Sequence, residues 1–234
     1  MGQDNGSEIP QWALASAVAA PITMIGTWTL AASLQDDGYD PVRDTLSWLA
    51  TRAAVAPMVG ACGFAATGVA HIITAAGLRP VPLAGRVVLG TGGLAMVGVA
   101  LMPTDRAHVA HMGAAAVSFV AMATWPAAAR DAAGIGRLAP WSGLAAASGM
   151  AAMLGWYMLE LQKLMPSKGS KTGLAERAVA VAQALWPLAV VVAARSGPQS
   201  GAAVAVAASA GATTRRRWPW TSWAVRATPT RHTA

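Results

Sequence analysis

The 234-residue chain has little charge: only 12% of its residues are Asp, Glu, Lys or Arg, about half the share of an ordinary soluble domain. Because 55% of the residues are hydrophobic, so few charges cannot cover the surface of a soluble globule. Disorder of the whole chain is also excluded, since disordered chains combine low hydrophobicity with high net charge. The composition therefore predicts an integral membrane protein.

Cysteine is almost absent as well. The single Cys62 excludes a disulfide framework and any zinc or iron–sulfur site built from cysteines. The sequence also lacks a phosphate-binding loop and the Gly-x-Ser-x-Gly elbow of serine hydrolases. No catalytic motif of these kinds points to an enzyme class.

Long apolar runs are what the sequence has in abundance. A helix that crosses a bilayer needs about 20 mostly apolar residues, and six segments meet this requirement. They cover about residues 12–34, 57–77, 84–102, 107–129, 138–159 and 174–194. We therefore predict an all-α, polytopic membrane protein with six transmembrane helices in one bundle.

Three regions follow from this reading. Residues 1–11 form a short N-terminal segment, residues 12–195 the transmembrane domain, and residues 196–234 a flexible tail rich in basic residues and tryptophan. The tail carries Arg215, Arg216 and Arg217 close to three indoles, a combination that suits anionic lipid headgroups better than nucleic acid. The predicted partners are the lipid bilayer, anionic lipids at the tail and other membrane proteins of a complex, with no nucleic acid.

The distribution of basic residues predicts the orientation. Ten Lys and Arg residues fall on the side of the membrane that holds both termini, against seven on the other side, which favours cytoplasmic termini. Most of the basic residues are Arg, and Ala and Gly are abundant, as is typical of high-GC bacterial coding sequences. We expect a multi-pass protein of the bacterial plasma (inner) membrane.

The connection after the first span is the most informative loop. Asp40 before Pro41 is typical of a helix start, and Val42, Leu46 and Leu49 then recur at helical spacing. This pattern predicts an amphipathic helix that lies along the membrane surface. In a second interpretation, the polar residues of this segment cover or line a pocket; these are Arg43, Asp44 and Ser47.

A second polar group precedes the fourth span. Asp105, His108 and His111 are three residues apart, so on a helix they share one edge and have the side chains to bind a divalent metal. The alternative is a helix cap followed by histidines at headgroup level. Together with polar residues of the first connection and with Glu160, this group forms a candidate polar cluster at the outer face. Its members are Asp40, Arg43, Asp44, Ser47, Asp105, Arg106, His108, His111 and Glu160.

No cofactor is predicted apart from a divalent metal at this site. Two axial histidines are needed for a haem shared between spans, but His71 and His111 differ in depth by roughly 15 Å at about 1.5 Å per residue. A haem is therefore not expected.

The chain resembles a family of small six-span bacterial proteins catalogued as domain of unknown function 998. The resemblance is carried by Tyr39-Asp40-Pro41, by the segment from Asp44 to Ala50, and by Pro103-Thr104-Asp105 with a histidine following. It covers about residues 12–195 and implies six helices in the membrane. It implies no activity, substrate or catalytic residue.

Two functions follow as hypotheses. The first is a non-enzymatic bundle, either an accessory subunit or a transporter-like or lipid-contacting protein, with its polar site at the outer face. The alternative is a membrane-embedded, metal-assisted hydrolase that acts on a lipid. Its metal would be held by Asp105, His108 and His111, with Asp44 or Glu160 as a further ligand or base.

Overall fold

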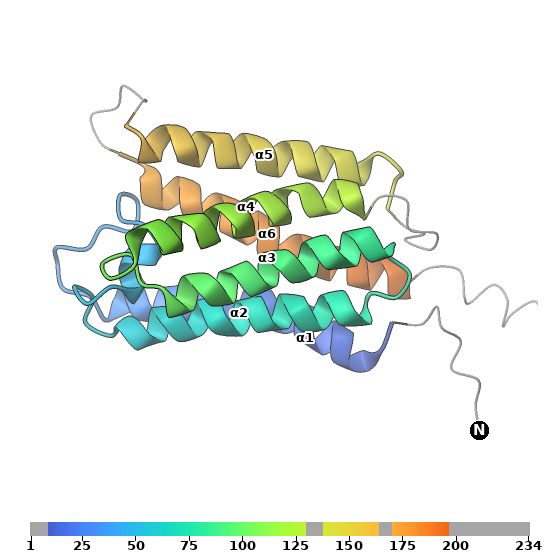
Figure 1. Cartoon of the computed structure of the whole chain (residues 1–234), viewed down its shortest axis with the longest axis horizontal. Helices are drawn as coiled ribbons and strands as arrows, with labels where there is room; N and C mark the ends of the chain where they lie inside the picture. Colours follow the sequence, from blue (N-terminus) through green and yellow to red (C-terminus); the bar gives the residue numbers. More distant parts are fainter. Residues whose placement is uncertain (1–8, 130–137, 164–169, 197–234) are drawn as a thin grey trace, which may run out of the picture. The chain divides into compact units, whose positions relative to one another are not determined.

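The computed structural model describes residues 9–129, 138–163 and 170–196. Within these residues it contains six α-helices and one short 3-10 helix (Figure 1). They are α1 Gln11–Ser33, η1 Ser47–Ala50, α2 Pro57–Gly77, α3 Leu83–Leu101, α4 His108–Ala128, α5 Ser142–Leu161 and α6 Thr172–Arg195. All six α-helices are long and apolar enough to cross a membrane. The six predicted spans are confirmed, with ends that differ by only a few residues, while the predicted tail lies outside the described residues from position 197 onward.

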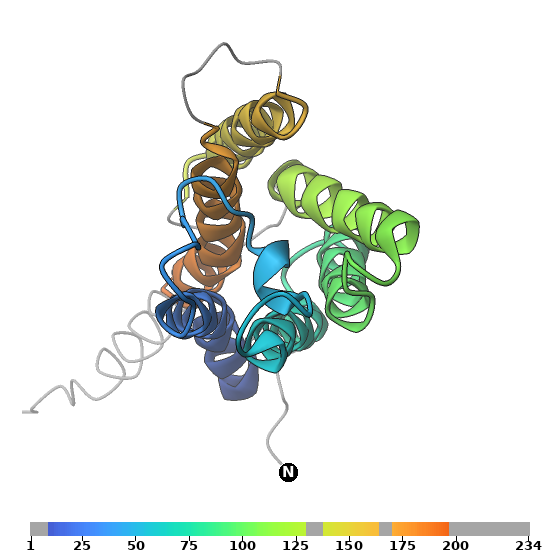
Figure 2. The ribbon, with the colours of Figure 1, turned by 90° about the vertical axis from the view of Figure 1, so that its left-hand side faces the viewer.

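The six helices form a closed ring. Each helix packs against its neighbours in the sequence, and α6 packs against α1 to complete the ring, as Figure 2 shows in end view. Because successive helices run in opposite directions, the C-terminal ends of α1, α3 and α5 and the N-terminal ends of α2, α4 and α6 lie together at one end of the ring. We call this the η1 end, since η1 lies there between α1 and α2.

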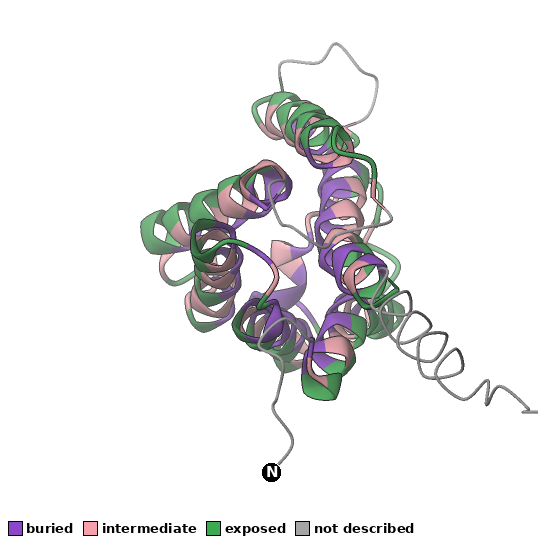
Figure 3. Cartoon of the chain, turned by 90° about the vertical axis from the view of Figure 1, so that its right-hand side faces the viewer, coloured by how far each residue is buried: buried purple, intermediate pink, exposed green. Residues whose placement is uncertain are grey.

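Burial divides each helix into an inner and an outer face (Figure 3). Buried residues face the interior of the ring, where Leu49 and Phe64 belong to one apolar cluster and Leu89 and Trp125 to another. The outer faces are also apolar, and on α3 Leu94 is 66% exposed. An apolar outside is the arrangement expected of helices that contact lipid.

A close helix contact lies between α2 and α3. A Cβ atom added to Gly68 would lie 2.5 Å from the Gly93 carbonyl oxygen, and one added to Gly93 would lie 2.6 Å from the Gly68 carbonyl oxygen. Two facing glycines thus bring the backbones of these helices together, which raises van der Waals contact where lipid removes the hydrophobic driving force.

The predicted amphipathic surface helix after the first span is wrong. Residues 41–56 form turns around the four-residue η1, and Leu46 and Leu49 point inward with 2% and 1% exposure. The physical reason is competition for backbone donors: the Leu46 N–H donates to Oε2 of Glu176 at 2.5 Å instead of to a carbonyl of its own turn. The segment therefore folds inward at the η1 end of the ring.

Candidate functional site

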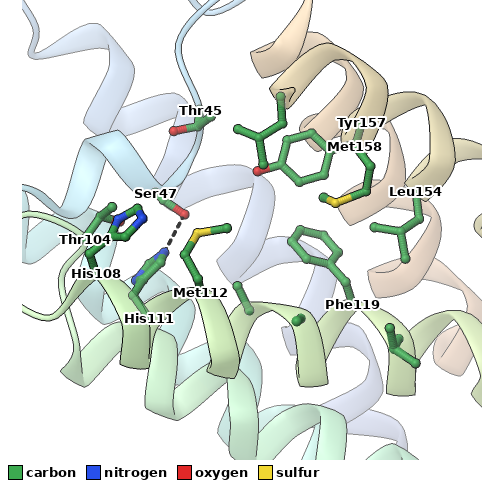
Figure 4. A pocket seen from close by; sticks show the side chains of 14 residues that line it. Thr45, Ser47, Thr104, His108, His111, Met112, Phe119, Leu154, Tyr157 and Met158 are labelled. Atoms are coloured by element: carbon green, nitrogen blue, oxygen red, sulfur yellow. Dashed lines mark hydrogen bonds between the residues drawn. The ribbon is translucent and has the colours of Figure 1, made fainter. Parts of the chain in front are cut away.

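A pocket lies between α4 and α5 at the η1 end, and we call it the α4–α5 pocket (Figure 4). Its cavity volume is about 310 Å³, at the lower end of the range for small-molecule sites. Most of its wall is apolar, and its polar side chains come mainly from the first connection and the start of α4. The lining residues are Thr45, Ser47, Thr104, His108, His111, Met112, Ala115, Ala116, Phe119, Val120, Leu154, Tyr157, Met158 and Leu161.

Ser47 and His111 are hydrogen-bonded to each other in the wall of this pocket. The Nδ1 atom of His111 lies 2.7 Å from the Met102 carbonyl oxygen, and its Nε2 atom lies 3.1 Å from Ser47 Oγ. Because a carbonyl oxygen only accepts, Nδ1 carries the proton of the neutral ring and Nε2 is left as an acceptor. The Ser47 hydroxyl therefore donates to His111, a ring that is only 2% exposed.

The residue before Ser47 is held by a buried carboxyl group on α6. Glu176 is 3% exposed, and its Oε2 atom accepts the backbone N–H of Leu46 at 2.5 Å. Because this contact joins the start of η1 to α6, the position of Ser47 depends on the bundle and not on its loop alone.

A second contact ties the first connection to α6. The Arg177 Nη1 atom donates to the carbonyl oxygens of Pro41 at 2.7 Å, Asp44 at 2.9 Å and Gly173 at 3.0 Å, and Nη2 donates to the Tyr39 hydroxyl. Burial raises the pKa of Tyr39 above its usual value, an effect larger than the opposing attraction of Arg177. The guanidinium thus fastens the loop that carries Ser47 to the first turns of α6.

The approach of this loop requires a residue without a side chain on α6. A Cβ atom added to Gly173 would collide with the carbonyl oxygens of Asp44 and Pro41. The Leu174 N–H donates to the Val42 carbonyl oxygen at 3.0 Å, so the two segments are paired through their backbones.

Of the predicted polar cluster, the structure brings Ser47, His108 and His111 together in the pocket. Figure 4 shows the rings of both histidines beside Ser47. His108 is exposed at the rim, whereas His111 is buried. The second interpretation of the first connection, that polar residues line a pocket, thus describes Ser47.

The acidic members of the cluster have separate partners. Asp105 accepts the Arg52 N–H at 3.2 Å and so joins two loops. Glu160 is buried and accepts the Trp156 indole N–H at 3.3 Å and the Lys171 N–H at 2.9 Å. These carboxylates connect neighbouring elements at the η1 end.

The remaining members lie in turns, where Arg43 and Arg106 are exposed and Asp40 and Asp44 are half-buried. Asp40 accepts the Val42 N–H at 2.9 Å and pairs with Arg43 at 3.3 Å, while Asp44 accepts the Asp40 N–H at 2.8 Å. Arg106 is exposed in the turn before α4. Asp40, Arg43, Asp44 and Arg106 are not among the residues that line the pocket.

The proposed metal ligands do not converge in the part of the chain that the structure describes, where no group of three His, Cys, Asp or Glu side chains has the geometry to hold a metal ion. Both ring nitrogens of His111 have hydrogen-bond partners, and Asp105 is bonded to the Arg52 backbone. Metal binding by Asp105, His108 and His111 stays a prediction for metal analysis to test.

Sequence reasoning missed the role of Glu176. Its signal was present, because an ionisable residue inside a membrane span usually faces the bundle interior and has a specific partner. What the sequence does not reveal is that this partner is the start of η1, 130 residues earlier in the chain.

A small cavity of about 30 Å³ lies next to the pocket in the interior of the ring, large enough for a water molecule. It shares Ser47, Ala115 and Phe119 with the α4–α5 pocket, and Glu176 and Gln183 also line it. Ser47 therefore lines both the α4–α5 pocket and this small interior cavity.

These features define a class: a six-span helical membrane protein with a pocket at one end of the ring. Residues 17–193 match the family described as "Protein of unknown function (DUF998)", and the chain belongs to this family. No curated protein and no solved structure matches the chain. The matched range includes Ser47, His111 and Glu176, so the pocket lies within the family domain.

Proposed function

We propose that this membrane protein binds the acyl chain of a lipid in the α4–α5 pocket. The observation that carries the proposal is the amphipathic character of the cavity: about 310 Å³ with a mostly apolar wall and polar side chains gathered at one end. An acyl lipid has the same division, with a long apolar chain and a polar headgroup. The pocket thus complements a lipid better than a polar solute.

The dimensions of the pocket support an extended chain. On α4 the lining runs from His108 to Val120, which is about 18 Å along a helix at about 1.5 Å per residue. Met112 and Phe119 lie between these two residues, and Leu154 lines the α5 side (Figure 4). A chain with its polar end near His108 would therefore extend along α4 toward Val120.

The sides of the pocket favour entry from the bilayer. Met112, Ala116 and Val120 are exposed residues of α4, and α5 has the lowest buried share among the six spans. Because these outer surfaces face hydrocarbon, an acyl chain would reach the pocket between α4 and α5 without crossing water. The ligand proposed is thus a lipid of the surrounding membrane.

The location of the headgroup follows from the orientation proposed. The excess of basic residues on the side of the termini supports cytoplasmic termini in a bacterial plasma membrane, with the η1 end at the outer face. In this arrangement the polar end of the pocket lies at the outer headgroup layer. Anionic lipids at the tail and further membrane-protein partners belong to the same proposal.

A photoreactive fatty acid with a diazirine in its chain tests the binding. We expect it to label the wild-type protein and to label Ala116→Phe about ten-fold less, because the added ring occupies the pocket and a loss of about 1.4 kcal/mol in binding is ten-fold. The matched control is Ala145→Phe, which adds the same ring on α5 at an exposed position outside the pocket. Equal labelling of the two variants would contradict the proposal.

The metal-assisted lipid hydrolase is the competing proposal. Nothing in the geometry favours it over lipid binding, since both nitrogens of His111 are hydrogen-bonded to protein atoms. Metal analysis of the purified protein and of His108→Ala separates the two: a stoichiometric metal that this substitution removes would favour the hydrolase.

A further inference from the structure

We infer that Ser47 and His111 form a nucleophile–base pair that hydrolyses an acyl ester of a lipid held in the α4–α5 pocket. This inference rests on the proposed function, because the pocket supplies the substrate. It adds an activity: cleavage of the ester bond between the acyl group and the alcohol part of the lipid.

The imidazole of His111 has the orientation of a general base. A serine hydroxyl becomes nucleophilic when a neighbouring base accepts its proton, and the base is effective when a third group fixes its tautomer. His111 meets both conditions: Nε2 lies 3.1 Å from Ser47 Oγ, and Nδ1 donates to the Met102 carbonyl oxygen at 2.7 Å. The Met102 carbonyl oxygen thus orients the imidazole, as a carboxylate does in a Ser-His-Asp triad.

The serine lies where a ligand in the pocket can reach it. A hydrogen bond between two fully buried side chains would serve only to satisfy both groups. Ser47, however, is only half-buried, lines the pocket and lies at its polar end (Figure 4). A chain that extends along α4 toward Val120 would place its carboxyl ester next to this hydroxyl.

A further hydroxyl lies in the same wall. Thr45 Oγ1 accepts the Trp48 N–H at 3.3 Å, which leaves its own proton free to donate. Because Thr45 lines the pocket, its hydroxyl is suited to donate to the oxygen that becomes negative when the ester is attacked.

The reaction balances with water as the only co-reactant. Ser47 Oγ bonds to the ester carbonyl carbon while its proton moves to His111 Nε2, and the bond to the lipid alcohol breaks as that proton passes to the leaving oxygen. A water molecule then attacks the acyl-serine, its proton passes through Nε2 to Ser47 Oγ, and a fatty acid leaves. No electrons are transferred to or from an outside group.

An alkyl fluorophosphonate tests the pair directly, because it forms a stable phosphonyl ester only with an activated serine. The purified full-length protein in lipid nanodiscs should gain one adduct by intact mass, and peptide mapping should place it on Ser47. We expect no adduct at this site in Ser47→Ala, and labelling about 10²-fold or more slower in His111→Gln, the usual contribution of a general base. Ser33→Ala, which removes an exposed serine of α1, should react like the wild type.

Two further measurements distinguish a failure of the proposed ester hydrolysis from a failure of lipid binding. A chelator should leave the labelling unchanged, whereas loss of labelling would point to the metal-assisted alternative. Wild-type protein that binds the diazirine fatty acid but shows no Ser47 adduct would overturn the inference and leave lipid binding intact. If the fatty acid does not bind either, the proposed function fails with it. The wild-type result decides even if a variant fails to fold.

Discussion

Arg177 is the residue on which the position of the first connection most depends. Its guanidinium donates to three carbonyl oxygens and to the Tyr39 hydroxyl, and it links residues 39–44 to α6. Lysine keeps the charge but lacks the planar fork that reaches several acceptors at once.

We expect Arg177→Lys to loosen residues 39–46. Hydrogen bonds to charged groups contribute about 1.5–3 kcal/mol each, so the loss of one should speed backbone amide exchange there by about ten-fold or more. Hydrogen–deuterium exchange measured by mass spectrometry would show the change. The control is Arg43→Lys, since Arg43 makes a single exposed ion pair with Asp40. Equal exchange in both variants would contradict this role for Arg177.

The Ser47–His111 pair shows the limit of sequence reasoning at this scale. Both residues were in the predicted polar cluster because each lies near a span end on the same side. Their pairing was not predictable, since the two residues are 64 positions apart and no serine-hydrolase motif surrounds Ser47. The inward fold of the first connection brings Ser47 to His111 on α4.

Among the elements, the six spans are determined by their local sequence, whereas η1 depends on a residue far away in the chain. Each span could be predicted because about 20 apolar residues in succession determine it without reference to the rest of the chain. The segment from Pro41 to Ala56 was mispredicted because its helical spacing competes with Glu176, which lies on α6. A contact over 130 residues cannot be read from periodicity.

The α2–α3 contact gives a prediction for helix packing. Gly68→Ala should lower the unfolding temperature of the purified protein by several degrees, because its new Cβ meets the Gly93 backbone and overpacking costs about 1–3 kcal/mol. The matched control is Gly149→Ala on α5, where an added Cβ has no atom within 4 Å. That change should leave the midpoint unchanged or raise it slightly, since alanine favours helix by up to about 1 kcal/mol. Similar midpoints for both variants would show that α2 and α3 do not pack this closely.

At the scale of the whole molecule, the orientation of the chain in the membrane decides on which side the polar end of the pocket lies. A cysteine at position 37, in a Cys62→Ala background, should react with a membrane-impermeant maleimide added to intact cells, because the first connection is proposed to be outside. A cysteine at position 79, in the turn at the opposite end of the ring, should react only after the cells are permeabilised. The reverse pattern would move the pocket's polar end to the cytoplasmic face.

The pocket is a property of the assembled ring, since its wall combines the first connection, α4 and α5. Sequence patterns indicated the polar end through His108 and His111 but not the apolar part. Met112, Phe119 and Leu154 look like ordinary span residues in the sequence, and only the packing of α4 beside α5 leaves a cavity between them.

The most direct measurement is a map of the crosslinks made by two diazirine fatty acids in the wild-type protein. With the diazirine near the carboxyl group, we expect crosslinks around Met112 and Met158. With the diazirine at the end of the chain, we expect crosslinks around Val120 and Leu154, deeper along α4 and α5. Crosslinks spread over the outer faces of α1 and α2, with no shift between the two probes, would contradict a bound acyl chain in the α4–α5 pocket.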